Sequence, residues 1–198
     1  MHGIICRSMQ AFVTVRHGPE AWRDVAALAD VDPAGFETVR AYPDALGRAV
    51  VEAASEMLDL PHRELLEDLG TWICTHPPLE PVRRLIRFSG ASFEEMLFAV
   101  DELHERADLA LPGIDLPLLS LIEQGGGRYR IATTWSAPGA GSVVIGVLRA
   151  MADDYGALAF LEYEHGAEVN GAWVETLSVR MLDAVHAAPR AFELGGAA

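Results

Sequence analysis

Apolar residues recur at helical spacing through the first part of the chain and at alternating positions after it. The helical spacing predicts helices over residues 4–16, 19–29, 44–57, 61–72 and 81–88, then a longer helix that begins at Ser92. Alternation predicts one hairpin from strands 118–123 and 129–135 around Gly125-Gly126-Gly127, and another from strands 157–164 and 173–181 around Asn170-Gly171. A further helix over 142–155 lies between the hairpins. This order predicts an α+β fold.

The same order predicts how the chain is organised. We expect a single domain over residues 1–183, in which a helical N-terminal lobe spans 1–60 and a second lobe with the Ser92 helix and a small antiparallel sheet spans 61–183. A cofactor cleft would lie between the lobes. Residues 184–198 are rich in small side chains and read as a loose tail.

Charge and cysteine content narrow the function classes. The net charge is −14, all fifteen basic residues are arginine, and no basic run occurs, which argues against nucleic acid and anionic membrane surfaces as partners. Apolar stretches fall short of the roughly 20 residues of a membrane span, and no signal peptide is recognisable. We therefore expect a cytoplasmic protein. Cys6 and Cys74, the two cysteines, are either inert core thiols or neighbours near the cleft.

One histidine in the Ser92 helix is a candidate metal ligand. Ser92 and Glu95 form a capping-box pattern that fixes the helix start. The apolar stripe of this helix passes beside His104 and consists of Met96, Val100, Leu103 and Ala107. A buried neutral imidazole can bind a metal through one nitrogen while the other donates a hydrogen bond. The alternative is a hydrogen-bonded core histidine, which is common on an apolar face.

Short motifs in a fixed order give the chain a recognisable resemblance. They are Met1-x-Gly3-Ile4-Ile5, His17-Gly18-Pro19-Glu20-x-Trp22, Tyr42-Pro43-Asp44, Ala53-Ala54-Ser55, Leu65-Leu66-Glu67 with Gly70, Leu103-His104, Pro117 and Val144-Ile145-Gly146. In this order the chain resembles the haem nitric oxide/oxygen-binding (H-NOX) domain, which is related to the haem domain of soluble guanylate cyclase. The resemblance implies haem b as cofactor, His104 as its axial iron ligand, and Pro117 as the residue that presses on and distorts the macrocycle.

The chain departs from the family at the propionate-binding motif Tyr-x-Ser-x-Arg. The corresponding places hold Thr133, Trp135 and Ala137, or in the neighbouring register Thr134, Ser136 and Pro138. Neither register supplies the arginine, whose charge-assisted hydrogen bonds would contribute about 1.5–3 kcal/mol. Arg128 and Arg130, just upstream, could substitute for it or could face solvent. The departure predicts weakened or altered haem binding.

Apolar residues from three matched segments would line the distal side of a bound haem. They are Ile5, Met9, Ile73, Val143 and Val144. None has a hydrogen-bond donor in its side chain, and the nearby Ser142 could equally be a helix cap. By resemblance, such a pocket retains nitric oxide or carbon monoxide and excludes oxygen, which needs a donor. The alternative is that the five residues are ordinary core.

The resemblance implies a haem-based nitric oxide sensor that changes conformation and signals to a histidine kinase or a nucleotide cyclase. The alternative is a haem-free relative whose cleft binds another apolar ligand or a protein, which Trp135 would favour by filling volume. No catalytic triad, phosphate loop or paired metal motif is present, and Cys74-x-His76 alone is weak evidence for zinc. We therefore expect no enzyme activity. The acidic pairs Glu94-Glu95, Asp101-Glu102 and Asp153-Asp154 are expected to be solvated.

Overall fold

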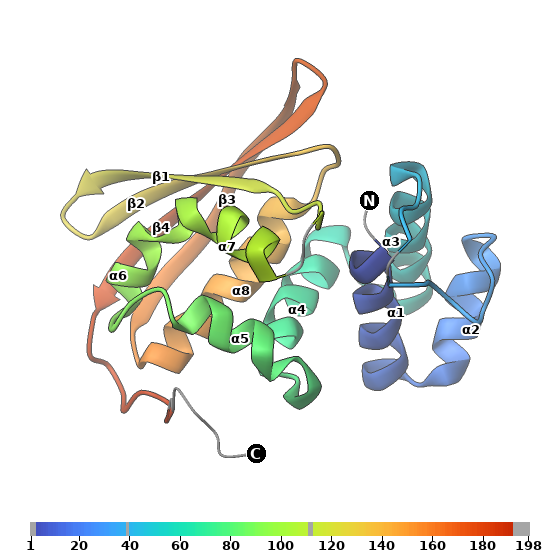
Figure 1. The fold of residues 1–198 in the computed structure, drawn as a ribbon, viewed down its shortest axis with the longest axis horizontal. Helices are drawn as coiled ribbons and strands as arrows, with labels where there is room; N and C mark the ends of the chain where they lie inside the picture. Colours follow the sequence, from blue (N-terminus) through green and yellow to red (C-terminus); the bar gives the residue numbers. More distant parts are fainter. Residues whose placement is uncertain (1–2, 39, 111–112, 192–198) are drawn as a thin grey trace.

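The computed structural model describes residues 3–38, 40–110 and 113–191. The helices are α1 (Gly3–His17), α2 (Pro19–Leu28), α3 (Asp44–Leu58), α4 (His62–Thr75), α5 (Glu80–Arg87), α6 (Phe93–Phe98), α7 (Leu103–Ala110) and α8 (Ala140–Tyr155). The strands are β1 (Leu118–Gly125), β2 (Arg128–Trp135), β3 (Leu158–Val169) and β4 (Ala172–Asp183). Helices and strands together form the α+β fold that the pattern predicts (Figure 1).

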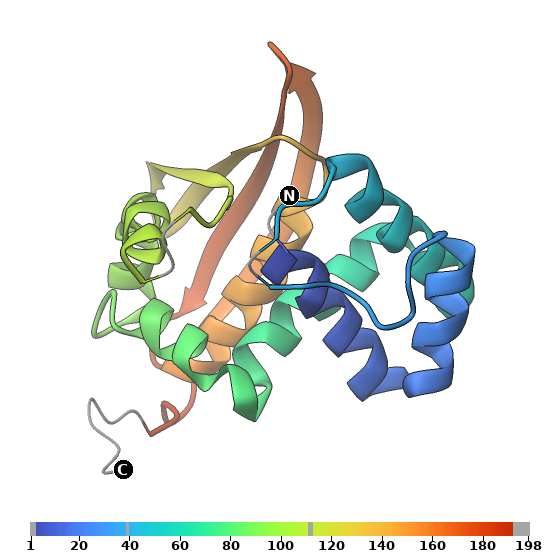
Figure 2. The same ribbon diagram turned by 45° about the vertical axis from the view of Figure 1, so that its right-hand side comes forward.

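The four strands form one antiparallel sheet in the order β1-β2-β4-β3. Tyr129, Ile131 and Thr133 of β2 are buried, whereas the alternating residues Arg128 and Arg130 are exposed. This alternation means that one face of the sheet packs on the helices and the other faces outward. The β3–β4 hairpin continues beyond the helices, as both ribbon views show (Figure 2).

Two hydrophobic cores lie on either side of α4. The first core joins α1, α2, α3 and one face of α4, and the rings of Phe12 and Trp72 meet there edge to face with centroids 5.8 Å apart. The second core lies between the sheet and helices α6 and α8, and its largest fully buried members include Met96, Ile131 and Leu177. Helix α4 contributes most of its buried residues to the first core and Cys74 to the second. It therefore links the α1–α3 group to the rest of the molecule (Figure 1).

Helices α4 and α8 cross with their backbones in close contact. A Cβ atom built on Gly146 would lie 1.9 Å from the carbonyl oxygen of Glu67, and one on Gly70 would lie 2.1 Å from that of Val143. The Thr71 hydroxyl also donates to the Gly146 carbonyl across the crossing, at 3.2 Å. Only glycine permits this approach, which explains the two glycines of the matched motifs physically.

Most predicted elements are present, but several details were wrong. Asp44 is the first helical residue of α3 and not its cap, because Pro43 is the N-cap and makes no side-chain capping bond. The Ser92 helix is broken into α6, a 3₁₀ turn at Val100–Glu102, and α7. The strands of the second hairpin are each 12 residues long, so they extend well past the predicted ends. Of the predicted tail, residues 192–198 lie outside the described part of the chain.

Candidate functional site

His104 lies at the start of α7, where the predicted apolar stripe anchors the helix. Met96, Val100 and Ala107 are buried and Leu103 is half-buried, so the stripe faces the interior as expected. His104 itself is half-buried, and its Nδ1 atom is buried without a hydrogen-bond partner among the described residues. The stripe thus positions an imidazole whose buried nitrogen lacks the partner that a core histidine needs.

The segment that precedes α7, from Ser92 to the 3₁₀ turn, connects the His104 helix to its neighbours through hydrogen bonds. Ser92 caps α6 by accepting a hydrogen bond from the Glu95 amide at 3.2 Å, which confirms one half of the capping box. The Glu95 carboxylate accepts from Ala91 instead of from Ser92, at 2.8 Å. Within the 3₁₀ turn, Asp101 accepts the amide of Leu121 on the free edge of β1 at 2.8 Å, so this residue holds a strand edge and is not simply solvated.

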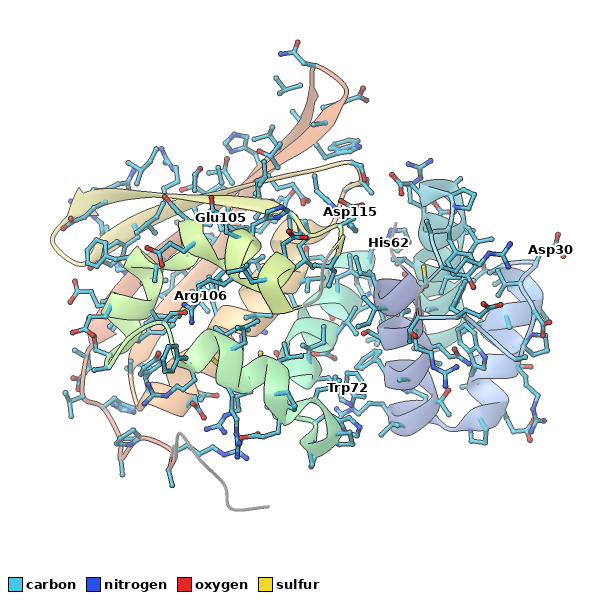
Figure 3. All side chains as sticks on the ribbon, viewed as in Figure 1. Asp30, His62, Trp72, Glu105, Arg106 and Asp115 are labelled. Atoms are coloured by element: carbon cyan, nitrogen blue, oxygen red, sulfur yellow. The ribbon has the colours of Figure 1, made fainter. Side chains whose placement is uncertain are left out.

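On the opposite side, Arg106 connects α7 to α5. Its guanidinium donates to the Ser89 hydroxyl at 2.5 Å and to the Leu85 carbonyl at 3.3 Å, and the labelled side chain lies between the two helices (Figure 3). These two bonds together with the Asp101–Leu121 bond fix the short helix from both sides. The position of His104 is therefore set by contacts with β1 and α5, not by one continuous helix.

The segment between α7 and β1 carries Pro117, which is half-buried. Residues 111–112 lie outside the described ranges. Asp115 in this segment accepts a hydrogen bond from the indole Nε1 of Trp135 at 3.1 Å, and it lies beside the start of β1 (Figure 3). Trp135, itself half-buried, therefore joins the end of β2 to the segment that holds Pro117.

The three motif positions that point inward are Thr133, Trp135 and Ala137. Thr133 and Ala137 are buried, whereas Ser136 and Pro138 of the alternative register are exposed. The Thr133 hydroxyl is fully buried and has no hydrogen-bond partner among the described residues. Because Ala137 is buried, an arginine side chain would find no open space there in this arrangement.

Arg128 and Arg130 do not substitute for that arginine. Both are exposed on the outward face of the sheet, in alternation with buried Tyr129 and Ile131. Arg130 forms an ion pair with Glu164 of β3, with Nε and Oε2 3.0 Å apart. The hypothesis that these arginines face the cleft was therefore wrong, and strand alternation gives the reason.

Glu175 of β4, a buried glutamate that the sequence analysis missed, contacts the beginning of α8. The Glu175 carboxylate accepts from the Gly141 amide at 2.8 Å, from the Gly139 amide at 3.1 Å and from the Tyr163 hydroxyl at 3.1 Å. Burial, followed by the neighbouring Glu175 charge, raises the pKa of Tyr163 to about 12. Gly139 is the N-cap residue, so Ser142, buried within the helix, is not the cap.

The five predicted distal residues lie on helices that meet near the α4–α8 crossing. Met9 of α1 belongs to the first core, and half-buried Ile73 of α4 and Val143 of α8 pack against that core. Val144 packs against the second core, and Ile5 of α1 is half-buried. The structure thus distributes these side chains over both cores.

The two cysteines do not form a pair. Cys6 lies in the first core and Cys74 in the second, and both side chains are buried. Burial, followed by the charge of Asp154, raises the pKa of Cys74 to about 12, so this thiol stays protonated and unreactive at neutral pH. The idea that the thiols approach each other near a cleft was wrong, and inert core is the better description.

Two of the acidic pairs also have buried partners. Asp154 is buried and pairs with Arg83, whose Nη2 lies 2.6 Å from Oδ1, and with Arg87, whose Nε lies 3.1 Å from Oδ2. Glu94 accepts a hydrogen bond from the Tyr129 hydroxyl. Asp154 is therefore buried, contrary to the expectation of a solvated position, whereas Glu94 is exposed as expected and also binds Tyr129.

Two properties of the whole described chain limit the chemistry. Among the described residues, no three His, Cys, Asp or Glu side chains are grouped so that they could hold a metal ion. No helix in the described ranges has the length and apolar character needed to cross a membrane.

Comparison with known proteins gives the chain a family. A family model described as Haem-NO-binding matches residues 2–159. The chain is 23% identical over 163 residues to soluble guanylate cyclase 89Da of Drosophila melanogaster, a match that covers 82% of this chain and 24% of that protein. It is 21% identical over 117 residues to soluble guanylate cyclase gcy-31 of Caenorhabditis elegans, covering 59% of this chain and 17% of that one. The chain thus spans about a quarter or less of these cyclases.

Solved structures agree on the fold. An H-NOX mutant from T. tengcongensis superposes with a TM-score of 0.75 at 14% identity, covering 93% of this chain and all of that one. A Cs H-NOX mutant with an unnatural amino acid superposes with a TM-score of 0.76 at 14% identity and covers 95% of this chain. With a family model that matches most of its length, this chain belongs to the Haem-NO-binding family and is an H-NOX domain.

Proposed function

We propose that this domain is a haem-based nitric oxide sensor in which His104 is the axial iron ligand. The single observation that carries the proposal is the buried Nδ1 of His104, which has no hydrogen-bond partner among the described residues. Leaving a buried polar atom without a partner costs about 1–3 kcal/mol, so such an atom calls for an explanation. Binding of a metal by the imidazole would explain the missing partner, because a metal-binding histidine is oriented towards the metal and not towards a partner in the core.

Two observations support a haem group here, the unpartnered His104 nitrogen and the apolar character of the proposed contact residues. When bound, haem would supply an iron atom that can bind a diatomic gas. His104 would hold the iron, and Pro117 and Trp135 would contact the macrocycle. The remaining contacts would come from Ile5, Met9, Ile73, Val143 and Val144. At the propionate end the buried Thr133 hydroxyl is available as a donor, but the family's arginine is absent.

The same side chains support a preference for nitric oxide and carbon monoxide over oxygen. Bound oxygen carries partial negative charge that a hydrogen-bond donor would stabilise, and none of the five distal side chains has an N–H or O–H group. An apolar wall desolvates that charge without giving a hydrogen bond in return. We therefore propose that the ferrous protein holds nitric oxide and forms no stable oxygen complex.

The connection to a partner would run through the contact between α4 and α8. Ile73 lies on α4 and Val143 on α8, and the two helices touch through Gly70 and Gly146. A change at the ligand would therefore reach the α1–α3 group through the same helices that bind it. The similarity of this chain to guanylate cyclases, and its resemblance to H-NOX domains, support a nucleotide cyclase or a histidine kinase as the partner that responds to this change.

The experiment that tests the proposal is haem titration of the purified protein, followed by its Soret absorption. We expect a Soret band that His104→Ala abolishes or shifts, because the axial ligand is lost. His165→Ala is the matched control, because His165 is exposed on β3 and should leave the spectrum unchanged. An identical spectrum for His104→Ala and wild type would refute the axial assignment. A persistent oxy spectrum in air would refute the proposed ligand preference.

A second candidate function is a haem-free module whose cleft takes another apolar ligand or a protein. The observation that favours it is Trp135, whose indole fills volume near Pro117 and whose one donor is already bound to Asp115. The same titration distinguishes the two functions. A wild-type protein that stays colourless with excess haem would support this second candidate.

A further inference from the structure

The beginning of α8 already holds a negative charge that belongs to the protein. The Glu175 carboxylate is 4% exposed and receives three donors, the amides of Gly139 and Gly141 and the hydroxyl of Tyr163. The N-terminal end of a helix attracts anions because its free amides and its dipole both favour negative charge. Glu175 occupies the amides of Gly139 and Gly141, so these two donors are not available to a carboxylate of a bound ligand.

Glu175 lies close to the residues that would face the ligand. Gly139 and Gly141 belong to the same turn region of α8 as Val143 and Val144, which follow within a few residues. Across the sheet, Glu175 is the direct register partner of Thr133, so both side chains lie on the inward face. The carboxylate therefore stands beside the buried Thr133 hydroxyl, at the place where the proposed haem site would have its propionate end.

The cations around Glu175 do not offset a second negative charge. Arg63 of α4 is exposed and lies 4.3 Å from the centre of the Tyr163 ring, where it contacts the ring face and not the carboxylate. Arg130 points to the outward face and is paired with Glu164. An ionised group of a ligand placed near Thr133 would thus meet Glu175 at close range in a poorly solvated place, where charge repulsion is weakly screened.

We propose that Glu175 sets the charge selectivity of the cleft, so that its α8 end prefers an uncharged ligand edge to an ionised carboxylate. The inference rests on the proposed haem function and goes beyond it by naming a residue that discriminates among macrocycles. Haem carries two propionates, and its dimethyl ester carries none while keeping the same iron. The pair of macrocycles therefore isolates the effect of ligand charge.

The test measures the dissociation constants of haem and of haem dimethyl ester by Soret titration of the apo-protein. The readout is the dissociation constant of haem divided by that of haem dimethyl ester. This ratio is compared between variants, because differences in size and solubility of the two macrocycles then cancel. We expect Glu175→Gln to lower this ratio about tenfold, since it removes one nearby negative charge. Glu164→Gln is the matched control on β3, because it removes an outward-facing charge, and it should leave the ratio unchanged.

Tyr163→Phe provides a second variant that keeps the carboxylate. It removes one donor to Glu175 but leaves the charge, so the ratio should stay as in wild type or rise. An unchanged ratio in folded Glu175→Gln, or an equal fall in Glu164→Gln, would overturn the inference while leaving the proposed function intact. If Glu175→Gln does not fold, a lowered ratio in Tyr163→Phe would overturn it instead. A wild type that binds neither macrocycle would overturn the proposed function and the inference together.

Discussion

Replacing Gly146 with alanine tests whether the α4–α8 contact holds the domain together. In an ordinary helix this change stabilises the protein by up to about 1 kcal/mol, because alanine is the better helix former. Here the added Cβ would lie 1.9 Å from the Glu67 carbonyl oxygen and 2.8 Å from the Thr71 amide nitrogen. Both neighbours are backbone atoms of α4, so no side-chain rotation relieves the clash.

The size of the effect follows from these distances. The two helices must separate by about 1 Å before the shortest contact reaches 3.0 Å. Overpacking of this kind typically costs about 1–3 kcal/mol. The separation also strains the hydrogen bond from Thr71 to the Gly146 carbonyl, which adds about 1 kcal/mol. After the gain in helix propensity is subtracted, we expect Gly146→Ala to lower the free energy of unfolding by about 1–3 kcal/mol.

The assay is urea denaturation of the apo-protein, monitored by circular dichroism at the helix band. Gly141→Ala in the same helix is the matched control, because a Cβ there would lie 3.1 Å from its nearest neighbours, Glu175 Cβ and Leu177 Cδ2, and not 1.9 Å from a backbone oxygen. We expect it to change the unfolding free energy by less than about 1 kcal/mol. Equal or greater stability of Gly146→Ala relative to wild type would show that the close helix contact is not a constraint on this fold.

Two further predictions concern buried charge and alkaline pH. Asp154→Asn should lower the unfolding free energy by about 3 kcal/mol, because it removes the buried charge that pairs with both Arg83 and Arg87 and leaves Arg83 only its pair with Glu80. Glu67→Gln, in a more exposed pair with Arg149, should cost less than about 1 kcal/mol, and urea denaturation of both variants checks this. The pKa of Tyr163 is raised to about 12, so the folded state keeps a proton that the unfolded chain loses. Stability should therefore fall as pH rises from about 10 to about 12, and Tyr163→Phe should make this fall smaller in denaturation at successive pH values.

The spacing of apolar residues predicted the helices and strands well, because that spacing depends on which side of each element is buried. The stripe that ends at Ala107 and the alternation around Ile131 both record which side of an element faces the core. The break at Val100–Glu102 could not be predicted in the same way. Its apolar positions keep a helical spacing, while the hydrogen bond that favours the turn comes from Leu121, whose place beside Asp101 depends on tertiary structure.

The site was predicted in part for the same reason. His104 was found because it stands beside an apolar stripe and because the resemblance assigns it a role, but nothing local shows whether its nitrogen is satisfied. Glu175 was missed, although a signal existed. It alternates in phase with buried Leu177 and Val179, so an acidic residue occupies an inward position of β4. An inward glutamate needs donors, and these come from α8 and β3, which sequence spacing does not connect.

The missing arginine and the buried glutamate are best understood together. Ala137 is 1% exposed and lies two residues before Gly139, whose amide donates to Glu175. An arginine placed at 137 would have to displace packed neighbours, and its guanidinium would then find a protein carboxylate at hand as its partner before any ligand arrived. We therefore expect that Ala137→Arg alone would not supply a partner for a ligand carboxylate, because Glu175 would compete for the guanidinium. A domain that binds haem in this way would hold it mainly through His104 and apolar contact.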